Sequence, residues 1–140
     1  CFMNFWGSQA PSASPWASAP SLRNSGASCI FHRMSTQALL VFCTCPDEKT
    51  ARSLAGGLVE QKLAACVNVL PAIRSIYRWQ GDVQDEAESL MVIKTGETRV
   101  AALQGWLVEH HPYDVPEVIA LPVEEGLPAY FEWVARETEQ

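Results

Sequence analysis

From Ala38 onward the apolar residues alternate between strand-like and helix-like spacing, and this order restricts the fold more than any other feature of the chain. Short apolar or alternating runs, typical of strands, occupy residues 38–43, 65–79, 83–95 and 115–123. Apolar residues spaced three and four apart, typical of one helix face, occupy residues 47–63, 97–110 and 127–138. The resulting order, β-α-β-β-α-β plus one C-terminal helix, predicts an α+β, ferredoxin-like fold whose antiparallel sheet has the strand order 4-1-3-2.

Three local features refine this prediction. The continuous apolar run of the first strand predicts burial on both faces. Pro71 lacks an N–H group and predicts a bulge or bend in the second strand, while Gln80-Gly81-Asp82 predicts the turn of a hairpin. Gly56-Gly57 weakens the first helix, so we expect a close backbone approach there, against the sheet.

The composition changes near Met34, which divides the chain into two parts. Residues 1–33 contain seven Ser and no Asp or Glu, and they show neither strand nor helix periodicity. This leader fits an organelle transit peptide or translated upstream sequence. We prefer the second interpretation, because the chain does not begin with Met, and we expect the folded domain to span residues 34–140.

Charge and cysteine content narrow the class of protein. The net charge of −6 argues against a nucleic-acid partner, and no apolar run is long enough to cross a bilayer. The cysteines are odd in number and follow no repeating framework, which favours reduced intracellular thiols over a disulfide-rich secreted domain. They are Cys1, Cys29, Cys43, Cys45 and Cys66.

Topology brings one set of candidate ligands together. If the first strand and the second helix run in the same direction, then Cys43, His110 and His111 lie at the same end of the domain. A thiolate with two imidazoles suits copper or zinc. Taken singly, these residue types favour structural roles: a histidine pair often caps a helix, and a cysteine often packs as a small hydrophobic residue. Cys45 could be a further ligand, but we interpret it as a loop residue.

Cys66 and the aromatic residues of a long hairpin are the remaining residues to which the sequence assigns a role. Cys66 lies within an apolar segment at the start of the second strand and is expected to pack in the core, at the opposite end from Cys43. Tyr77 and Trp79 lie on a long hairpin that exceeds the rest of the sheet in length. An exposed edge with such residues favours pairing with another chain, which predicts an oligomer.

Catalytic motifs do not appear in the sequence. It contains no Gly-rich phosphate loop, no GxSxG elbow and no HExxH. An acylphosphatase-like hydrolase on this fold would need a phosphate-cradling loop with an Arg beside the first strand, and the segment CTCPDE supplies neither. We therefore expect no enzyme activity and no catalytic residues.

Three segments carry a resemblance to a known family: VFCTCPDEKTARSLAGGLVEQKLAACVNVLPAIRSIYRWQGDV, SLMVIKT and HHPYDVPEVIALPV. They closely resemble the CutA divalent-cation tolerance proteins, and the hairpin matches the family's Ser-x-Tyr-x-Trp-x-Gly pattern. In this chain the pattern falls on Ser75, Tyr77, Trp79 and Gly81.

The resemblance implies a cytoplasmic homotrimer, related in fold to the PII signalling proteins, that binds copper (Cu²⁺) or another divalent cation such as zinc. On the family's motif the metal ligands fall on Cys43, His110 and His111. The implied function is metal-ion binding with tolerance of, or response to, metal ions. The alternative is a trimeric PII-like signalling module that takes a small ligand, by analogy of fold alone. Cys45 and the leader depart from the family's pattern.

Overall fold

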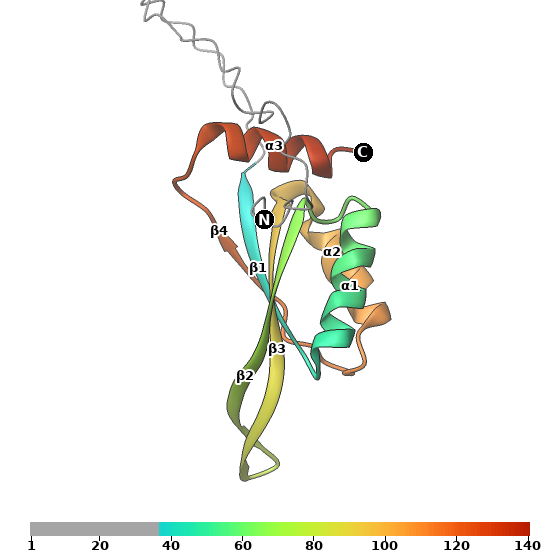
Figure 1. Ribbon diagram of the computed structural model, residues 1–140, viewed down its shortest axis with the longest axis vertical. Helices are drawn as coiled ribbons and strands as arrows, with labels where there is room; N and C mark the ends of the chain where they lie inside the picture. Colours follow the sequence, from blue (N-terminus) through green and yellow to red (C-terminus); the bar gives the residue numbers. More distant parts are fainter. Residues whose placement is uncertain (1–36) are drawn as a thin grey trace, which may run out of the picture. The chain divides into compact units, whose positions relative to one another are not determined.

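The computed structural model describes residues 37–140, so the leader of residues 1–33 lies outside the described part of the chain. Within it, four strands and three α-helices follow the predicted order (Figure 1). The strands are β1 (Ala38–Cys45), β2 (Cys66–Trp79), β3 (Asp82–Gly96) and β4 (Ile119–Pro122). The helices are α1 (Glu48–Glu60), α2 (Val100–His110), which follows a single 3-10 turn at Glu97–Arg99, and α3 (Pro128–Thr138).

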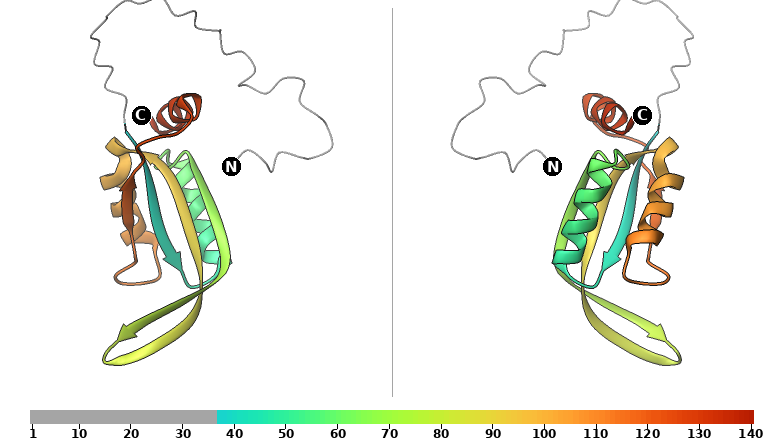
Figure 2. Two further views of the ribbon diagram at one scale, coloured as in Figure 1. Left: turned by 90° about the vertical axis from the view of Figure 1, so that its left-hand side faces the viewer. Right: turned by 90° about the vertical axis from the view of Figure 1, so that its right-hand side faces the viewer.

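The strands form one antiparallel sheet in the order β2-β3-β1-β4, which confirms the predicted topology. In the register of β1 with β3, Cys43 lies opposite Met91 and Cys45 lies opposite Ser89. Helices α1 and α2 lie on the same side of this sheet (Figures 1 and 2). The sheet and the layer of two helices that covers it are those of a ferredoxin-like fold.

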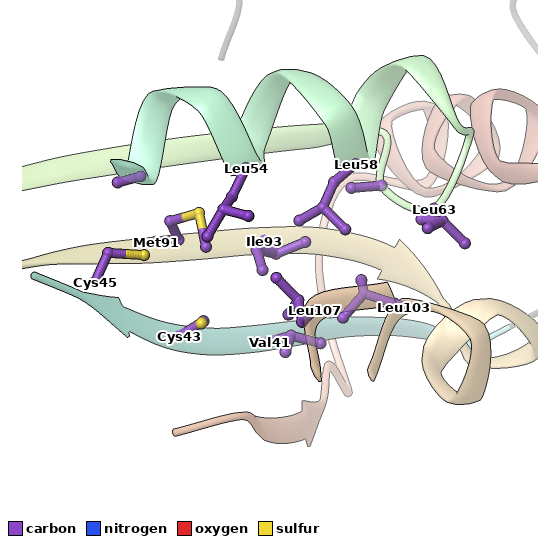
Figure 3. Close-up of a cluster of buried hydrophobic side chains, with 12 residues drawn as sticks. Val41, Cys43, Cys45, Leu54, Leu58, Leu63, Met91, Ile93, Leu103 and Leu107 are labelled. Atoms are coloured by element: carbon purple, nitrogen blue, oxygen red, sulfur yellow. The ribbon is translucent and has the colours of Figure 1, made fainter. Parts of the chain in front are cut away.

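The core lies between the helices and the sheet (Figure 3). Successive side chains of a strand point to opposite faces, so every second residue of β1 faces the helices. Three of these residues, Val41, Cys43 and Cys45, are buried, and the first, Leu39, is half-buried at the start of the strand. The alternate residues Leu40 and Phe42 are only half-buried. The prediction that β1 is buried on both faces is therefore wrong for the single chain.

Local signals placed most element ends correctly. Asp47 caps α1, since its side chain accepts a hydrogen bond from the N–H of Thr50 at 2.7 Å. The register of β2 shifts between Leu70 and Ile73, with Ala72 at a φ of 58°, which confirms the irregularity predicted at Pro71.

The hairpin between β2 and β3 turns at Gln80 and Gly81, whose φ values of 49° and 89° are those of a tight two-residue turn. β4 is shorter than the run from which it was predicted, and it begins only at Ile119. Pro116 has no N–H group to donate to a neighbouring strand, which contributes to this late start.

The glycine pair in α1 has a different neighbour from the one predicted. A Cβ atom on Gly57 would lie 2.5 Å from the indole of Trp106 in α2, whereas a Cβ on Gly56 would meet nothing within 4 Å. The close approach therefore joins the two helices and does not involve the sheet. Among residues 37–140, none of the helices has the length and apolar character needed to span a bilayer.

Candidate metal centre

Two thiols line the end of β1. Cys43 and Cys45 are two residues apart on a strand, so their side chains point to the same face. Both are free thiols with no exposed surface. The interpretation of Cys45 as a loop residue is wrong, because it is the last residue of β1 and belongs to the core.

His111 reaches the same place from the other side of the fold. It is the C-cap residue of α2, and its backbone N–H donates a hydrogen bond to the carbonyl of Leu107 at 2.8 Å. The following Pro112 disfavours a helical conformation for His111, whose ψ is 141°. This extended backbone turns the chain away from the helix axis, and the His111 side chain is only 8 % exposed.

Both ring nitrogens of His111 have hydrogen-bond partners. Nε2 donates to the carbonyl oxygen of Thr44 at 2.8 Å, and Nδ1 accepts from the backbone N–H of Tyr113 at 3.0 Å. These partners place the ring proton on Nε2. The same nitrogen lies 3.7 Å from the sulfur of Cys45.

The three side chains form one compact group of potential ligands. Sγ of Cys43, Sγ of Cys45 and a ring nitrogen of His111 all lie within 4.8 Å of one another, and all three residues are buried. Two sulfurs bound to one zinc or copper ion at about 2.3 Å would lie about 3.8 Å apart in a tetrahedral site and about 4.6 Å apart in a linear one. The spacing of the group therefore fits a single ion.

The two thiols differ in acidity because they share a hydrogen bond. The pKa of Cys43 lies far above the usual thiol range, because its thiol bonds to Cys45 and because burial disfavours the thiolate. The negative charges of Glu117 and Glu88 act in the same direction. The pKa of Cys45 is lowered by the hydrogen bond from Cys43.

His110 lies outside this group. Its side chain is exposed, its ring stacks on Trp106 with a centroid distance of 4.0 Å, and its Nδ1 donates to the carbonyl of Trp106 at 2.7 Å. The structure thus brings together Cys43 and His111 of the predicted trio and adds Cys45, while His110 packs on its own helix. Cys66 is buried at the start of β2, opposite Lys94 in the strand register, as the core interpretation predicted. It is disulfide-bonded, so the expectation of reduced thiols is wrong for this cysteine.

A buried carboxylate near the group was not identified from the sequence. The hydroxyl of Tyr113 donates to Glu88 Oε1 at 2.8 Å, and Glu88 is buried on β3. The ring of Tyr113 lies 4.9 Å from that of His111. The sequence could have indicated Tyr113 through its position two residues after His111. Its partner Glu88 could be identified only from the register of the sheet.

The fold and this group together define a ferredoxin-like α+β protein with a buried set of soft ligands at one end of the sheet. The family model for the CutA1 divalent ion tolerance protein matches residues 39–137 of the chain. The chain therefore belongs to the CutA1 family, as the sequence resemblance indicated.

Curated relatives agree with this assignment. Protein CutA of Mus musculus is 52% identical over 98 residues, which cover 70% of this chain and 55% of the mouse protein. The divalent-cation tolerance protein CutA of Thermus thermophilus is 44% identical, and the match covers 71% of this chain and 96% of that protein. The chain thus spans little more than half the length of the mouse relative.

Solved structures show the same fold. The crystal structure of CutA1 from Oryza sativa superposes with a TM-score of 0.73 at 44% identity, covering 76% of this chain and 98% of the rice chain. The Thermus thermophilus structure gives a TM-score of 0.71 at 43% identity, covering 73% of this chain and 99% of the other. Two plant relatives, from Oryza sativa and Arabidopsis thaliana, are named as chloroplastic.

Proposed function

We propose that this protein binds divalent transition-metal ions, copper or zinc, and takes part in tolerance of, or response to, such ions. The observation that carries the proposal is the buried group of Cys43, Cys45 and His111, whose ligand atoms lie within 4.8 Å of one another. Relatives from Thermus and Citrobacter are named as divalent-cation tolerance proteins, which supports the same function here. The proposal is one of binding, not of catalysis.

Cys43 and His111 are the ligands that the sequence and the contacts of the fold both favour. As a thiolate, Cys43 would supply negative charge, and a neutral imidazole would supply a nitrogen donor. His111 would have to give up the hydrogen bond from its Nε2 to Thr44 in order to bind an ion through that nitrogen. His110 would join only if its ring left the face of Trp106.

The charges around the group favour a cation. Glu88 and Glu117 are close enough to raise the pKa of Cys43, so their negative charge also favours a positive ion at the sulfur. The net charge of −6 for the whole chain adds a weak attraction at longer range. Both effects would raise the local concentration of cations.

We further propose that the protein acts as a homotrimer and that the β2–β3 hairpin supplies the contacts. The hairpin projects beyond the rest of the sheet (Figure 1). It exposes Ile76, Trp79 and Val83, which are 70%, 62% and 64% exposed in the single chain. Apolar side chains gathered on a projecting hairpin favour burial against another chain. Analytical ultracentrifugation tests the oligomeric state.

For the cellular location we propose the cytoplasm, where Cys43 and Cys45 would remain free thiols. Import into an organelle would require residues 1–33 to act as a transit peptide, and the chloroplastic plant relatives keep that alternative open. Fluorescence microscopy of the chain with and without residues 1–33, fused to a fluorescent protein, distinguishes the two locations.

Isothermal titration of the reduced full chain with Cu²⁺ and Zn²⁺ tests the proposed function. We expect saturable binding that is strongly weakened in Cys43→Ser and weakened to a lesser extent in His111→Ala, whereas His110→Ala should bind nearly as tightly as the unaltered chain. Absence of saturable binding to either ion would contradict the proposal. A rise in melting temperature with small anions or metabolites but not with metal would favour the PII-like alternative.

A further inference from the structure

We propose that Cys45 and Cys43 together form a two-sulfur clamp that selects soft ions, monovalent copper above all, over harder divalent ions. This inference rests on the proposed metal-binding function and names the class of ion that the same site prefers. It assigns a role to Cys45, which the sequence resemblance leaves unassigned.

The arrangement of β1 provides the first argument. Cys43 and Cys45 are separated by one residue, point to the same face of the strand and are held in place by the strand's pairing with β3. Their sulfurs lie within 4.8 Å of each other in a region with no exposed surface. Because both sulfurs are held by one rigid element, an ion between them needs no change of backbone.

The hydrogen bonds of His111 provide the second argument. Both of its ring nitrogens are engaged, Nε2 with the Thr44 carbonyl and Nδ1 with the Tyr113 N–H. The sulfurs have no comparably strong partners, since a thiol is a weak donor and a weak acceptor. The two sulfurs are therefore the readiest donors in the group, with the imidazole as a third ligand that must first exchange its partner.

Because the two sulfurs are the readiest donors, they determine which ion the site prefers. Monovalent copper has a filled d shell, favours thiolate and thioether ligands and accepts two or three donors. Divalent copper and nickel favour four donors in a plane, and magnesium and calcium require six or more oxygens. A pair of sulfurs with one optional nitrogen meets the requirement of monovalent copper but not those of divalent copper, nickel, magnesium or calcium.

The surroundings of the sulfurs provide the third argument. Met91 lies directly opposite Cys43 in the β1–β3 pairing and is fully buried, so a thioether faces the same side of the sheet as the two thiols (Figure 3). Leu54 of α1 belongs to the same buried cluster. The apolar side chains and the thioether on this side of the two sulfurs disfavour ions that keep bound water.

Binding involves no change of oxidation state. Each thiol gives its proton to solvent as its sulfur donates an electron pair to the copper, which enters and remains as the monovalent ion. The electron count of both sulfurs is unchanged, and no oxidant or reductant is consumed.

The test is a competition titration of the reduced full chain under anaerobic conditions, with monovalent copper held by a bicinchoninate chelator. Zinc and magnesium are titrated separately, and charge-transfer absorption in the near ultraviolet reports copper–thiolate bonds. Cys45→Ser removes the sulfur with little change in volume. Thr44→Ser is the matched control, because Thr44 lies on the same strand but points to the other face.

We expect one monovalent copper ion per chain. In Cys45→Ser the copper affinity should fall roughly 100-fold or more. Loss of a residue that only hydrogen-bonds to a metal ligand costs about 10- to 100-fold, so a larger loss indicates that Cys45 itself binds the ion. Zinc affinity should fall by about tenfold at most, and Thr44→Ser should match the unaltered chain. Magnesium should not bind. Circular dichroism confirms that each variant is folded.

The outcomes separate this inference from the proposed function. If Cys45→Ser holds monovalent copper as tightly as the unaltered chain, or if zinc displaces copper at equal concentration, the two-sulfur clamp is wrong while metal binding through Cys43 stands. If the unaltered chain binds none of the three ions, both proposals fail.

Discussion

Nε2 of His111 lies 3.7 Å from the sulfur of Cys45, although the two residues are separated by 66 positions in the sequence. The contact exists because β1 and α2 end at the same edge of the domain and because His111 leaves the helix with an extended backbone. It joins the two sequence segments that carry the candidate ligands. The predictions below follow from this juxtaposition and from the packing that maintains it.

The stability of the domain should depend on His111 even without metal. His111→Ala removes two hydrogen bonds and leaves the Thr44 carbonyl and the Tyr113 N–H without their partner. We expect a loss of about 1–3 kcal/mol in the free energy of unfolding of the metal-free protein. Urea denaturation measures it. His110→Ala is the control and should cost less, because its side chain is exposed; equal losses in the two variants would contradict this account.

Replacing each of the two adjacent glycines of α1 with alanine should change the stability of the domain in opposite directions. Gly57→Ala would place a methyl group 2.5 Å from the indole of Trp106, so we expect destabilisation by about 1–3 kcal/mol. Gly56→Ala meets nothing within 4 Å and improves helix propensity, so we expect stabilisation by about 0.5–1 kcal/mol. Thermal and urea unfolding of both variants test the pair. A Gly57→Ala variant as stable as Gly56→Ala would show that the two helices are not in close contact.

The Tyr113–Glu88 hydrogen bond should affect stability at high pH. Burial and the bond to Glu88 raise the pKa of Tyr113 above its ordinary value, so the folded state favours the protonated phenol. This contribution is fully present below the unfolded pKa of about 10 and is lost as the pH rises through the folded value. Tyr113→Phe should therefore lower the free energy of unfolding by about 0.5–1 kcal/mol at neutral pH. Above pH 10 this free energy should decline less steeply in the variant than in the unaltered chain.

Urea unfolding from neutral to alkaline pH measures the effect of Tyr113→Phe. Tyr77→Phe is the matched control, since Tyr77 also bonds a glutamate, Glu86, but does so on the exposed hairpin. Identical pH profiles for the Tyr113 variant and the unaltered chain would contradict the assigned role of the hydrogen bond.

Metal binding should weaken on acidification and release protons. The pKa of Cys43 is strongly raised, so its thiol keeps its proton at neutral pH until an ion displaces it. Calorimetry in two buffers with different ionisation enthalpies counts the protons released. We expect Cys43→Ser to release fewer protons per bound ion than the unaltered chain. An equal count would exclude Cys43 as a ligand.

The hairpin should control assembly if the proposed trimer is correct. Ile76→Asp places a charge on a side chain that is 70% exposed in the single chain, so it should leave the monomer folded and disrupt the oligomer. Val108→Asp, on α2 and also exposed, is the control and should not change assembly. Sedimentation velocity measures both. A trimer that persists in Ile76→Asp would remove the hairpin from the proposed interface.

The sequence was sufficient for the fold because its signals are local. The spacing of Leu103 and Leu107 predicted the buried face of α2, and Gly81 predicted the hairpin turn. The partner of Gly57 was not predictable in this way, because helix spacing does not say which neighbour a glycine faces. The contact with Trp106 arises from the packing of α1 against α2.

The candidate site was predictable only in part. Topology placed Cys43 near the end of α2, but it could not choose between His110 and His111, which leave the helix in different directions. That choice depends on the ψ of 141° at His111, where the helix ends before Pro112. Cys45 was misassigned because the apolar run ends at Cys43, whereas pairing with β3 extends the strand to Cys45.

The central claim is that the sulfurs at the end of β1 hold a metal ion. X-ray absorption at the copper edge of the copper-loaded full chain tests it most directly. We predict sulfur neighbours at about 2.3 Å, reduced in number in Cys45→Ser and absent in the double variant with Cys43→Ser. A copper ion surrounded by nitrogen and oxygen alone in the unaltered chain would contradict the claim.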